Sequence, residues 1–418
     1  MSSSAVVTQN EWFKVIQCCL ENCDFEVINN KIKPLGYGAG FFGEHRLAEI
    51  SVRLRDINKT QRVLHFFIKT QPQKLLEQRE IVEQTRMFKK EVDALSKLFV
   101  LLRSVLNDKG KGMQWTCKCF YTNSQVIVLE DITMQGFQTI DGRINIEYHH
   151  CAAVIKAIAN LHAASLIFEE THPNQPHRLG NEYPDILEEC LFKHAPNHPG
   201  TEWLKTTIEC LWRVVQEILG DRADLRTKAL LENALQSLFE LVKPSEKFRN
   251  TVCHGDLWRN NIFFRGDENK VEARLVDFQF IRYSPPANDI VCFLHLTTSR
   301  SFRKEYTSAL LSCYYDHLSR TLLRYGISPD YVLPRQELEE SCEFYRKLGV
   351  VVAPCYLTVV ALNEEDIERM FASSAEFERF VKRDRTPEVM HSFKCDSYYR
   401  ERVTESVQEL LEECVLKS

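Results

Sequence analysis

The chain has 418 residues, enough for one large unit or for two to three domains. Its composition, 44% apolar and 27% charged, is that of an ordinary globular protein with a large core. The net charge of −5 gives no basic field for nucleic acid or for an anionic membrane, and no run of roughly 20 apolar residues suggests a membrane span. Fifteen scattered cysteines show no disulfide framework, and the start lacks the pattern of a signal peptide. We therefore expect a cytoplasmic protein with no nucleic-acid or membrane partner.

A glycine-rich segment, Gly36–Gly43, follows a short predicted helix over residues 11–23. Gly38, Gly40 and Gly43 fit the pattern G-x-G-x-x-G, which also marks dinucleotide-binding folds. Those folds need a helix directly after the glycines, so that its N-terminus meets the pyrophosphate. Here apolar and polar residues alternate over 49–55, which predicts a half-exposed strand instead. Two strands joined by glycines predict a flap over the phosphates of ATP, and a plain glycine-rich hairpin is the alternative.

The next predicted strand covers residues 62–70 and ends at Lys69, and a helix is predicted over 76–102. Glu91 lies at the edge of the apolar stripe of this helix, where a carboxylate needs a cation. In kinases, a strand lysine paired with a helix glutamate is aimed at the α- and β-phosphates. The order of these residues after the glycines predicts such an ATP-binding pair, and two separate surface charges are the alternative.

A buried strand is predicted over 125–129, and Glu130 and Ile132 follow it at the place where kinases hold adenine through the backbone of a hinge. An ordinary strand end is the alternative. Beyond this point the pattern turns helical, over 148–165, 201–219, 227–241, 302–325 and 335–352. A strand-rich front and a helical back predict an α+β, two-lobed fold. The predicted boundary is Thr133, with an ATP-binding lobe over 1–133 and a helical lobe over 134–418.

The most informative motif is His254-Gly255-Asp256, with Asn261 five residues after the aspartate. Asp277 follows at the end of a strand in the single hairpin, 262–278, that we predict in the helical part. In kinases, the first aspartate orients or deprotonates the acceptor hydroxyl, and the asparagine and second aspartate hold magnesium ions. We therefore predict ATP and Mg²⁺ as cofactors, Asp256 as the catalytic residue, and Asn261 and Asp277 as metal ligands. A polar turn between two strands is the alternative.

Together these motifs resemble the insect ecdysteroid-kinase-like family, relatives of choline and aminoglycoside kinases with a protein-kinase-like fold. The resemblance covers nearly the whole chain and includes Gly36-Tyr37-Gly38-Ala39-Gly40, Phe67-Ile68-Lys69, Val128-Leu129-Glu130-Asp131, Asn160-Leu161-His162-Ala163-Ala164-Ser165, His254-Gly255-Asp256-Leu257-Trp258-Arg259-Asn260-Asn261, Val276-Asp277-Phe278-Gln279 and Pro286-Ala287-Asn288-Asp289-Ile290. It implies ATP-dependent phosphorylation of a hydroxyl on a small molecule, with ecdysteroids the best-known substrates. It also implies that His254 and Asp289 brace the catalytic loop. Phe41 and Phe42 depart from the family, whose members usually carry a small polar residue there.

The acceptor is expected to be a small molecule and not a peptide. Only eleven residues separate Asp277 from Asp289, and no Ala-Pro-Glu motif follows, so a peptide has no platform. We predict an ecdysteroid or a similar apolar alcohol. A detoxification kinase for plant-derived hydroxylated or glycosylated compounds is one alternative, and an inactive nucleotide-binding module is another. Tyrosines 314, 315 and 356 could form a cation–π cage for a choline-like acceptor, although such tyrosines commonly belong to the core. The sequence does not indicate whether the protein is a monomer or an oligomer.

Overall fold

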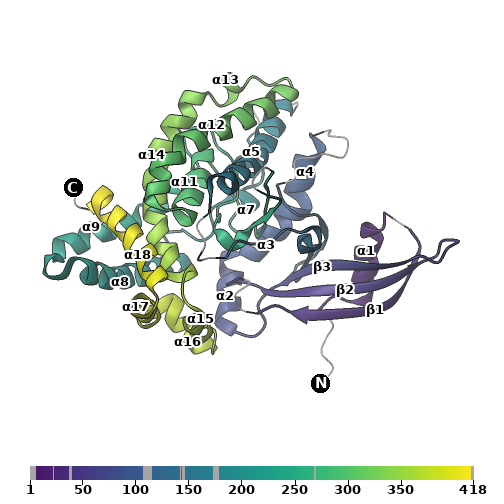
Figure 1. Ribbon diagram of the computed structural model, residues 1–418, viewed down its shortest axis with the longest axis horizontal. Coiled ribbons are helices and arrows are strands. Elements are labelled where there is room, and N and C mark those ends of the chain that lie inside the picture. Colours follow the sequence, from purple (N-terminus) through teal and green to yellow (C-terminus); the bar gives the residue numbers. More distant parts are fainter. Residues whose placement is uncertain are drawn as a thin grey trace.

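The computed structural model describes residues 6–21, 23–36, 40–106, 115–141, 143, 146–172, 178–267 and 270–415. A β-sheet lies at one side of the molecule and a larger helical part at the other (Figure 1). The sheet has five antiparallel strands in the order β1 (Phe25–Pro34), β2 (Glu44–Leu54), β3 (Gln61–Thr70), β5 (Val126–Glu130) and β4 (Cys119–Thr122). This arrangement confirms the predicted α+β class.

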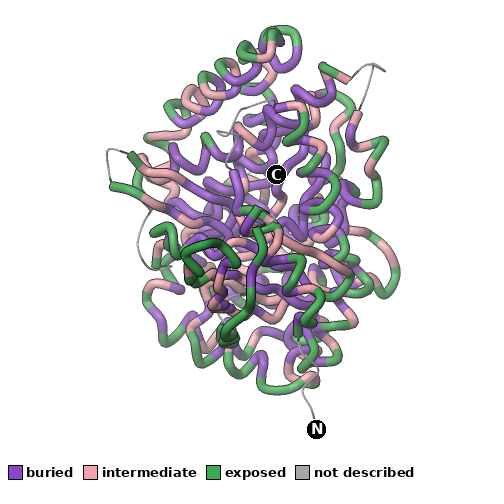
Figure 2. The backbone as a smooth tube through the Cα atoms, turned by 90° about the vertical axis from the view of Figure 1, so that its right-hand side faces the viewer, coloured by how far each residue is buried: buried purple, intermediate pink, exposed green. Residues whose placement is uncertain are grey.

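The sheet is half-buried, as its alternating sequence predicts. Along β2, buried positions alternate with half-exposed ones, which confirms the strand expected over 49–55. The buried side chains include Val52 and Phe66, which pack with Trp12 of α1 (Gln9–Cys19). β1 is the outer strand, exposed at every position after its first residue (Figure 2). The sheet therefore has one small core of its own, under α1.

The helix predicted over 76–102 is interrupted. The structure has α2 (Leu76–Thr85), α3 (Met87–Asp93), a π-helical turn η2 (Ala94–Leu98) and α4 (Phe99–Ser104) in its place. The break falls at Arg86, whose φ of +57° is left-handed and therefore ends the right-handed hydrogen-bond ladder. Arginine is a good helix former, so propensity gives no warning of this break.

The helical part surrounds α5 (Tyr148–Thr171), which is buried along most of its length. The other helices are α6 (Leu179–Glu182), α7 (Pro184–Leu187), α8 (Pro199–Leu219), η4 (Gly220–Arg222), α9 (Leu225–Gln236), α10 (Leu238–Leu241), α11 (Pro286–Thr297), α12 (Arg300–Arg324), α13 (Pro329–Val332), α14 (Arg335–Val360), α15 (Glu364–Met370), α16 (Ser374–Glu378), η6 (Arg379–Arg383), α17 (Thr386–Cys395), α18 (Ser397–Leu410) and η7 (Leu411–Val415). The five predicted helical stretches are all present. The predicted lobe boundary, Thr133, lies in the short helix η3 (Ile132–Gln135), and the boundary itself stays a prediction.

Among the described residues, α5 is long and apolar enough to cross a membrane, and α14 with α15 would pass the same test as one segment bent by 85°. However, 83% of the apolar stretch of α5 is buried inside the protein. The apolar character of α5 is therefore accounted for by its place in the core.

Two short strand pairs carry the loop that contains Asp256. β7 (Ile262–Arg265) pairs with β8 (Glu272–Leu275), which is the predicted hairpin. β6 (Thr251–Cys253) also pairs with β9 (Arg282–Ser284), a second strand pair, formed by segments distant in the sequence, that the sequence analysis missed. Strands of three residues are too short for a period to be recognised in the sequence.

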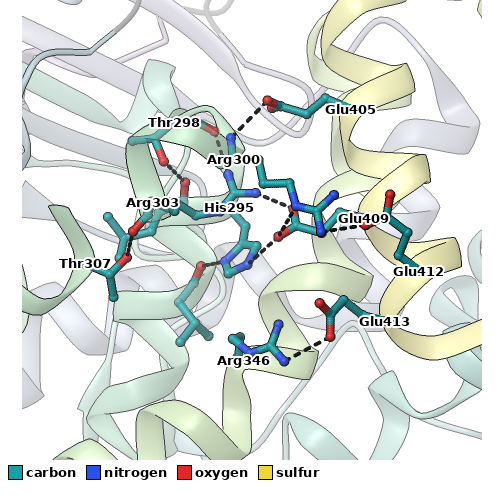
Figure 3. A network of polar contacts seen from close by, with 12 residues as sticks. His295, Thr298, Arg300, Arg303, Thr307, Arg346, Glu405, Glu409, Glu412 and Glu413 are labelled. Carbon is teal, nitrogen blue, oxygen red and sulfur yellow. Dashed lines mark hydrogen bonds and ion pairs between the residues drawn. The ribbon is translucent and has the colours of Figure 1, made fainter. Parts of the chain in front are cut away.

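A polar network fastens the last helices to α11, α12 and α14 (Figure 3). Arg303 of α12 forms an ion pair with Glu409 of α18, and both side chains are about nine-tenths buried. Further ion pairs join Arg300 to Glu412 at 2.6 Å and Arg346 to Glu413 at 3.0 Å. These pairs connect α18 and η7 to the helices that follow the catalytic loop.

His295 of α11 lies inside this network. Its Nδ1 is 2.7 Å from the carbonyl oxygen of Val291, and its ring is buried. Burial, and then the positive charges of Arg303 and Arg346, lower the pKa of His295 to about 3. Glu409 lies 3.9 Å from the other ring nitrogen, but it is already paired with Arg303. His295 is therefore a neutral histidine in the folded protein.

Candidate active site

Three charged side chains meet between the sheet and the helical part. Lys69 Nζ lies 2.6 Å from Glu91 Oε2 and 2.7 Å from Asp277 Oδ1. The Lys69 and Glu91 side chains are only 4% and 2% exposed. Burial alone would lower the pKa of Lys69, but the carboxylates of Asp277 and Glu91 outweigh it and raise the pKa above its ordinary value. The predicted Lys69–Glu91 pair is present, and its lysine is charged.

Strand register explains the position of Lys69. The residue lies on β3 opposite His45 of β2 and Ile127 of β5, near the middle of the sheet. Its neighbour Ile68 points into the core under α1, so Lys69 points to the opposite face, toward the helical part. Glu91 comes from α3, and its Oε1 also accepts a hydrogen bond of 3.3 Å from the backbone N–H of Phe278. Glu91 therefore connects the sheet lysine to the segment that carries Asp277.

Asp277 has a strained backbone. Its φ is +66°, in the left-handed region that residues other than glycine rarely adopt. Such a conformation costs on the order of 1–3 kcal/mol and persists where the surroundings determine it. Here the residue directly follows the strand end at Leu275-Val276, and its side chain is held by Lys69. The strain points the carboxylate into the space shared by the sheet and the catalytic loop.

Asp256 and Asn261 contact one another in the loop between β6 and β7. The Asn261 Nδ2 donates to the Asp256 carboxylate Oδ2 at 3.0 Å and to its backbone carbonyl at 2.9 Å. The other carboxylate oxygen, Oδ1, is buried and has no hydrogen-bond partner among the described residues. Burial, and then the charge of Asp277, raise the pKa of Asp256 to about 8. A carboxyl group with this pKa is suited to accept a proton near neutral pH.

His254 and Asp289 brace this loop, as the resemblance implied. The Asp289 carboxylate accepts from the backbone N–H of His254 at 2.7 Å and of Gly255 at 2.9 Å. The His254 ring accepts at Nδ1 from the Asp256 N–H, at 3.2 Å, so its Nε2 donates to the Val276 carbonyl at 2.9 Å. Both strand pairs are thereby tied to one loop conformation.

Gly255 and Arg282 form a further support that the sequence analysis missed. Gly255 has a φ of +82°, and a side chain there would place Cβ 2.2 Å from the carbonyl oxygen of Phe280. The Arg282 guanidinium donates to the Gly255 carbonyl at 2.5 Å and pairs with Glu189 at 2.7 Å. The importance of Gly255 could have been inferred from the sequence, because the residue lies inside the His254-Gly255-Asp256 motif. Nothing in the local sequence marks Arg282 or its distant partner.

The glycine segment lies against the lysine. Gly38 is outside the described residues, whereas Gly40 and Gly43 are described. A Cβ on Gly43 would lie 3.1 Å from the Lys69 side chain, and one on Gly40 would lie 2.7 Å from the His45 ring. Burial, and then the charge of Lys69, lower the pKa of His45 to about 4, so the His45 ring beside the lysine is neutral. The small residues let the loop approach the Lys69 ammonium.

The predicted adenine-binding residues lie at the end of β5. The Glu130 carboxylate accepts hydrogen bonds from Gln135 at 2.6 Å and from the backbone N–H of Lys118 at 3.3 Å. Ile132 is buried in the main core. Their side chains are therefore used within the protein, and the predicted role of their backbone in holding adenine stays a prediction.

A small, mainly apolar cavity of about 80 Å³ adjoins the catalytic loop. Asp256, Asp277 and Gln279 are its polar lining residues, and Phe41, Trp258 and Tyr356 are among the apolar and aromatic ones. Tyr314 is buried and its hydroxyl lies 2.8 Å from His162, and Tyr315 donates to Asp330. The three tyrosines of the possible cation–π cage therefore do not come together.

The donors gathered here fit magnesium-bound ATP. Asp256, Asn261 and Asp277 supply carboxylate and amide oxygens, which are the ligands that Mg²⁺ prefers. Lys69 supplies a fixed positive charge beside Asp277 and the glycine loop. The orphaned Oδ1 of Asp256 leaves one buried acceptor for a proton or a cation. Of the predicted site residues, Lys69, Glu91, Asp256, Asn261 and Asp277 lie together, whereas Glu130 and Ile132 lie at the strand end.

The order of these parts defines the kinase-like class: a glycine loop, a strand lysine with its helix glutamate, an aspartate–asparagine loop and a second aspartate. The model of the ecdysteroid kinase-like family matches residues 45–327, more than half of the chain. The protein belongs to this family, which supports a phosphotransferase that acts on a small molecule. No curated protein matches the sequence.

Several solved structures resemble the chain at low sequence identity. They include an ethanolamine kinase from Plasmodium vivax, 13% identical, with a TM-score of 0.41, covering 90% of this chain and 81% of its own. A microcompartment-associated aminopropanol kinase is 13% identical, with a TM-score of 0.38 and coverages of 96% and 95%. An aminoglycoside phosphotransferase from Streptomyces rimosus, in complex with ADP and streptomycin, is 13% identical, with a TM-score of 0.33 and coverages of 81% and 96%. At these TM-scores the similarity carries no conclusion about the activity of this chain.

Proposed function

We propose that this protein is an ATP- and magnesium-dependent kinase that phosphorylates a hydroxyl of an ecdysteroid or a similar apolar alcohol. One observation carries the proposal. Asp256, a buried carboxylate whose Oδ1 has no hydrogen-bond partner among the described residues, lines the same mainly apolar cavity as Asp277. A proton acceptor beside a metal-binding carboxylate suits phosphoryl transfer, and the apolar walls suit an apolar acceptor.

Each charged side chain has a role in this proposal. Asp256 orients the acceptor hydroxyl and takes its proton as the oxygen attacks the γ-phosphorus and ADP leaves. Lys69, held by Glu91, would bind the phosphates of the nucleotide, and Asn261 and Asp277 would hold the metal. Magnesium-bound ATP, when present, supplies the phosphoryl group and neutralises part of its charge.

The aromatic walls favour an acceptor with a rigid apolar body. Burial of apolar surface contributes roughly 25 cal/mol per Å². A small cation such as choline has less apolar surface to bury than a rigid fused-ring alcohol, so it would gain less binding free energy from this cavity. Among the described residues that line the cavity, Asp256 and Asp277 are the acidic ones, and the proposal assigns both to phosphoryl transfer and not to an acceptor cation. We further propose that the protein works in the cytoplasm without nucleic-acid or membrane partners, in keeping with its charge and composition.

Detoxification of plant-derived hydroxylated or glycosylated compounds is the second candidate function. It needs the same phosphotransfer residues, and Gln279 gives the cavity one neutral polar group for a second hydroxyl. An inactive nucleotide-binding module is less well supported, because Lys69, Asp256, Asn261 and Asp277 are all present and lie together.

The test is a competition assay with magnesium and ATP, in which an ecdysteroid, a plant phenolic glucoside, choline and a serine peptide are present at equal concentrations. Mass spectrometry reads the gain of one phosphate, and Asp256→Asn is the inactive control. We expect labelling of the ecdysteroid. Labelling of the glucoside alone would move the role to detoxification, and labelling of choline or the peptide would contradict the apolar acceptor. A nucleotide-dependent thermal shift without any turnover would support the inactive module.

A further inference from the structure

We propose that Phe41 determines acceptor specificity, because it roofs the apolar cavity and couples acceptor binding to nucleotide binding. This inference rests on the proposed function, since it names a residue of the same site and its effect on the same acceptor. The residue belongs to the glycine loop, where a role toward phosphates and not toward the acceptor is expected.

The Phe41 ring lies between two other segments of the chain. Its centroid is 6.0 Å from the ring of Trp258, which belongs to the catalytic loop. On the other side it stacks on Phe371, directly after α15, at 6.1 Å and an interplanar angle of 24°. Both distances are within the range of aromatic packing. Phe41 thus joins the glycine loop, the catalytic loop and the C-terminal helices over the cavity.

Helix α2 fastens this roof at its base. Gln78 donates to the Phe41 carbonyl at 2.5 Å, so the loop is tied to α2 through its backbone. The same helix is tied to the C-terminal wall, because Glu77 pairs with Lys382 and the Leu76 N–H donates to Ser374 at 3.0 Å. Figure 1 shows α2 beside α16. The roof and the C-terminal wall of the cavity are therefore mechanically connected.

The size of the cavity shows why this roof has to move. Sites for drug-sized ligands have volumes of roughly 300–1,000 Å³, whereas this cavity has about 80 Å³. We expect an acceptor with fused rings to enter when the Phe41 ring lifts from Trp258, and the lifted ring then packs on the acceptor and contributes to its affinity. In the proposed function, the glycine segment that carries Phe41 covers the nucleotide phosphates, so a bound nucleotide would change the position of the roof. Acceptor and nucleotide then affect each other's affinity by the same factor.

The experiment compares Phe41→Ala with the matched control Phe13→Ala. Phe13 lies half-exposed on α1 and contacts Phe25, far from the lining residues. Calorimetry measures the Kd of ecdysone, as probe, with and without magnesium and a non-hydrolysable ATP analogue. We expect nucleotide to tighten ecdysone binding about tenfold in the wild type and in Phe13→Ala. In Phe41→Ala this factor should fall to near one and ecdysone affinity should drop about 10- to 100-fold, the effect of losing one aromatic contact with the acceptor. Affinity for the analogue alone should change less than threefold.

An unchanged coupling factor and ecdysone affinity in Phe41→Ala would overturn the inference, as would an equal loss in Phe13→Ala. The assay needs no turnover, so it separates this inference from the proposed function. Coupled binding that depends on Phe41, without phosphorylation of any alcohol, would keep the roof and reject the kinase. Phosphorylation with normal coupling in Phe41→Ala would keep the kinase and reject the roof. Wild-type protein that does not bind ecdysone at all would overturn this assignment of the roof.

Discussion

The ammonium of Lys69 lies 2.6 Å from the carboxylate of Glu91, and neither side chain is more than 4% exposed. Each charge is therefore held inside the protein by its partner. Removing one member of a buried ion pair leaves the other without compensation, which typically costs 3–5 kcal/mol. Replacing both members with apolar residues avoids that cost. The pair can thus be tested for its structural and catalytic contributions separately.

We expect Lys69→Met to lower the free energy of unfolding by about 3–5 kcal/mol and to abolish measurable phosphotransfer. The double variant Lys69→Met/Glu91→Leu should regain part of the stability and none of the activity, because Asp277 still lacks its lysine partner in this variant. Urea denaturation and an ATP-consumption assay give the two readouts. Lys31→Met is the control, because Lys31 belongs to a solvent-exposed pair with Glu49 and should leave both unchanged. Equal stability of Lys69→Met and wild type would contradict the buried pair.

Asp256→Asn should lower turnover by about 10²–10⁴-fold, because the loss of a general base or orienting group has this size. The Kd for magnesium-bound nucleotide should change little. The folded state should be about as stable as the wild type, because burial already raises the pKa of Asp256 to about 8 and the amide therefore replaces a carboxyl that is largely neutral at pH 7. Retention of more than half of the wild-type kcat on any accepted substrate would refute the assignment.

Substitutions of the two predicted metal ligands should differ in the size of their effect on magnesium binding. Asp277 is charged and has a fixed, left-handed backbone, so Asp277→Ala should abolish magnesium-dependent nucleotide binding. Asn261 is neutral and shares its amide with Asp256, so Asn261→Ala should raise the magnesium concentration needed for half-maximal rate. Magnesium titrations of nucleotide binding and turnover measure both effects. Identical titration curves in the two variants and the wild type would remove the metal role.

The lowered pKa of His295 leads us to predict a loss of folding stability in mild acid. Its pKa of about 3 in the folded protein is below the ordinary value of 6.5, so between these values the unfolded chain binds a proton that the folded one does not. Stability from this group is complete above pH 6.5 and falls as the pH is lowered toward 3. At pH 5 the loss is about 2 kcal/mol. Urea denaturation from pH 7 to pH 5 should show this loss in the wild type and a smaller one in His295→Gln. Equal slopes would exclude His295 as the cause.

The site could be predicted well wherever the pattern is local. Asp256 and Asn261 lie five residues apart within one loop, so their spacing can be read directly from the sequence. Lys69 lies near the end of a strand that the alternation of apolar and polar residues predicts. The Lys69–Glu91 pair was predicted across one strand–helix connection. These inferences needed residue order and strand period, and both are present in the sequence.

Features made by distant segments could not be predicted. The break at Arg86 depends on one left-handed residue of good helix propensity. The β6–β9 pair has three residues in each strand, and the Arg282–Glu189 support joins two otherwise unremarkable charges. Phe41 was recognised as a departure from the family, but its contacts with Trp258 and Phe371 exist only once the chain is folded. Tertiary packing, and not local preference, determines each of these features.

The roof and the far wall of the cavity both lie outside the stretch of the chain that the family model matches. Phe41 precedes residue 45, and the wall residues Tyr356, Phe377 and Phe380 follow residue 327, so they flank the matched stretch that contains Lys69, Asp256 and Asp277. Substitutions in these two flanking segments could therefore change which acceptor fits, while the phosphate-transfer residues stay as they are. Exchanging the two segments for those of another member of the family is a direct route to altering which alcohol is modified.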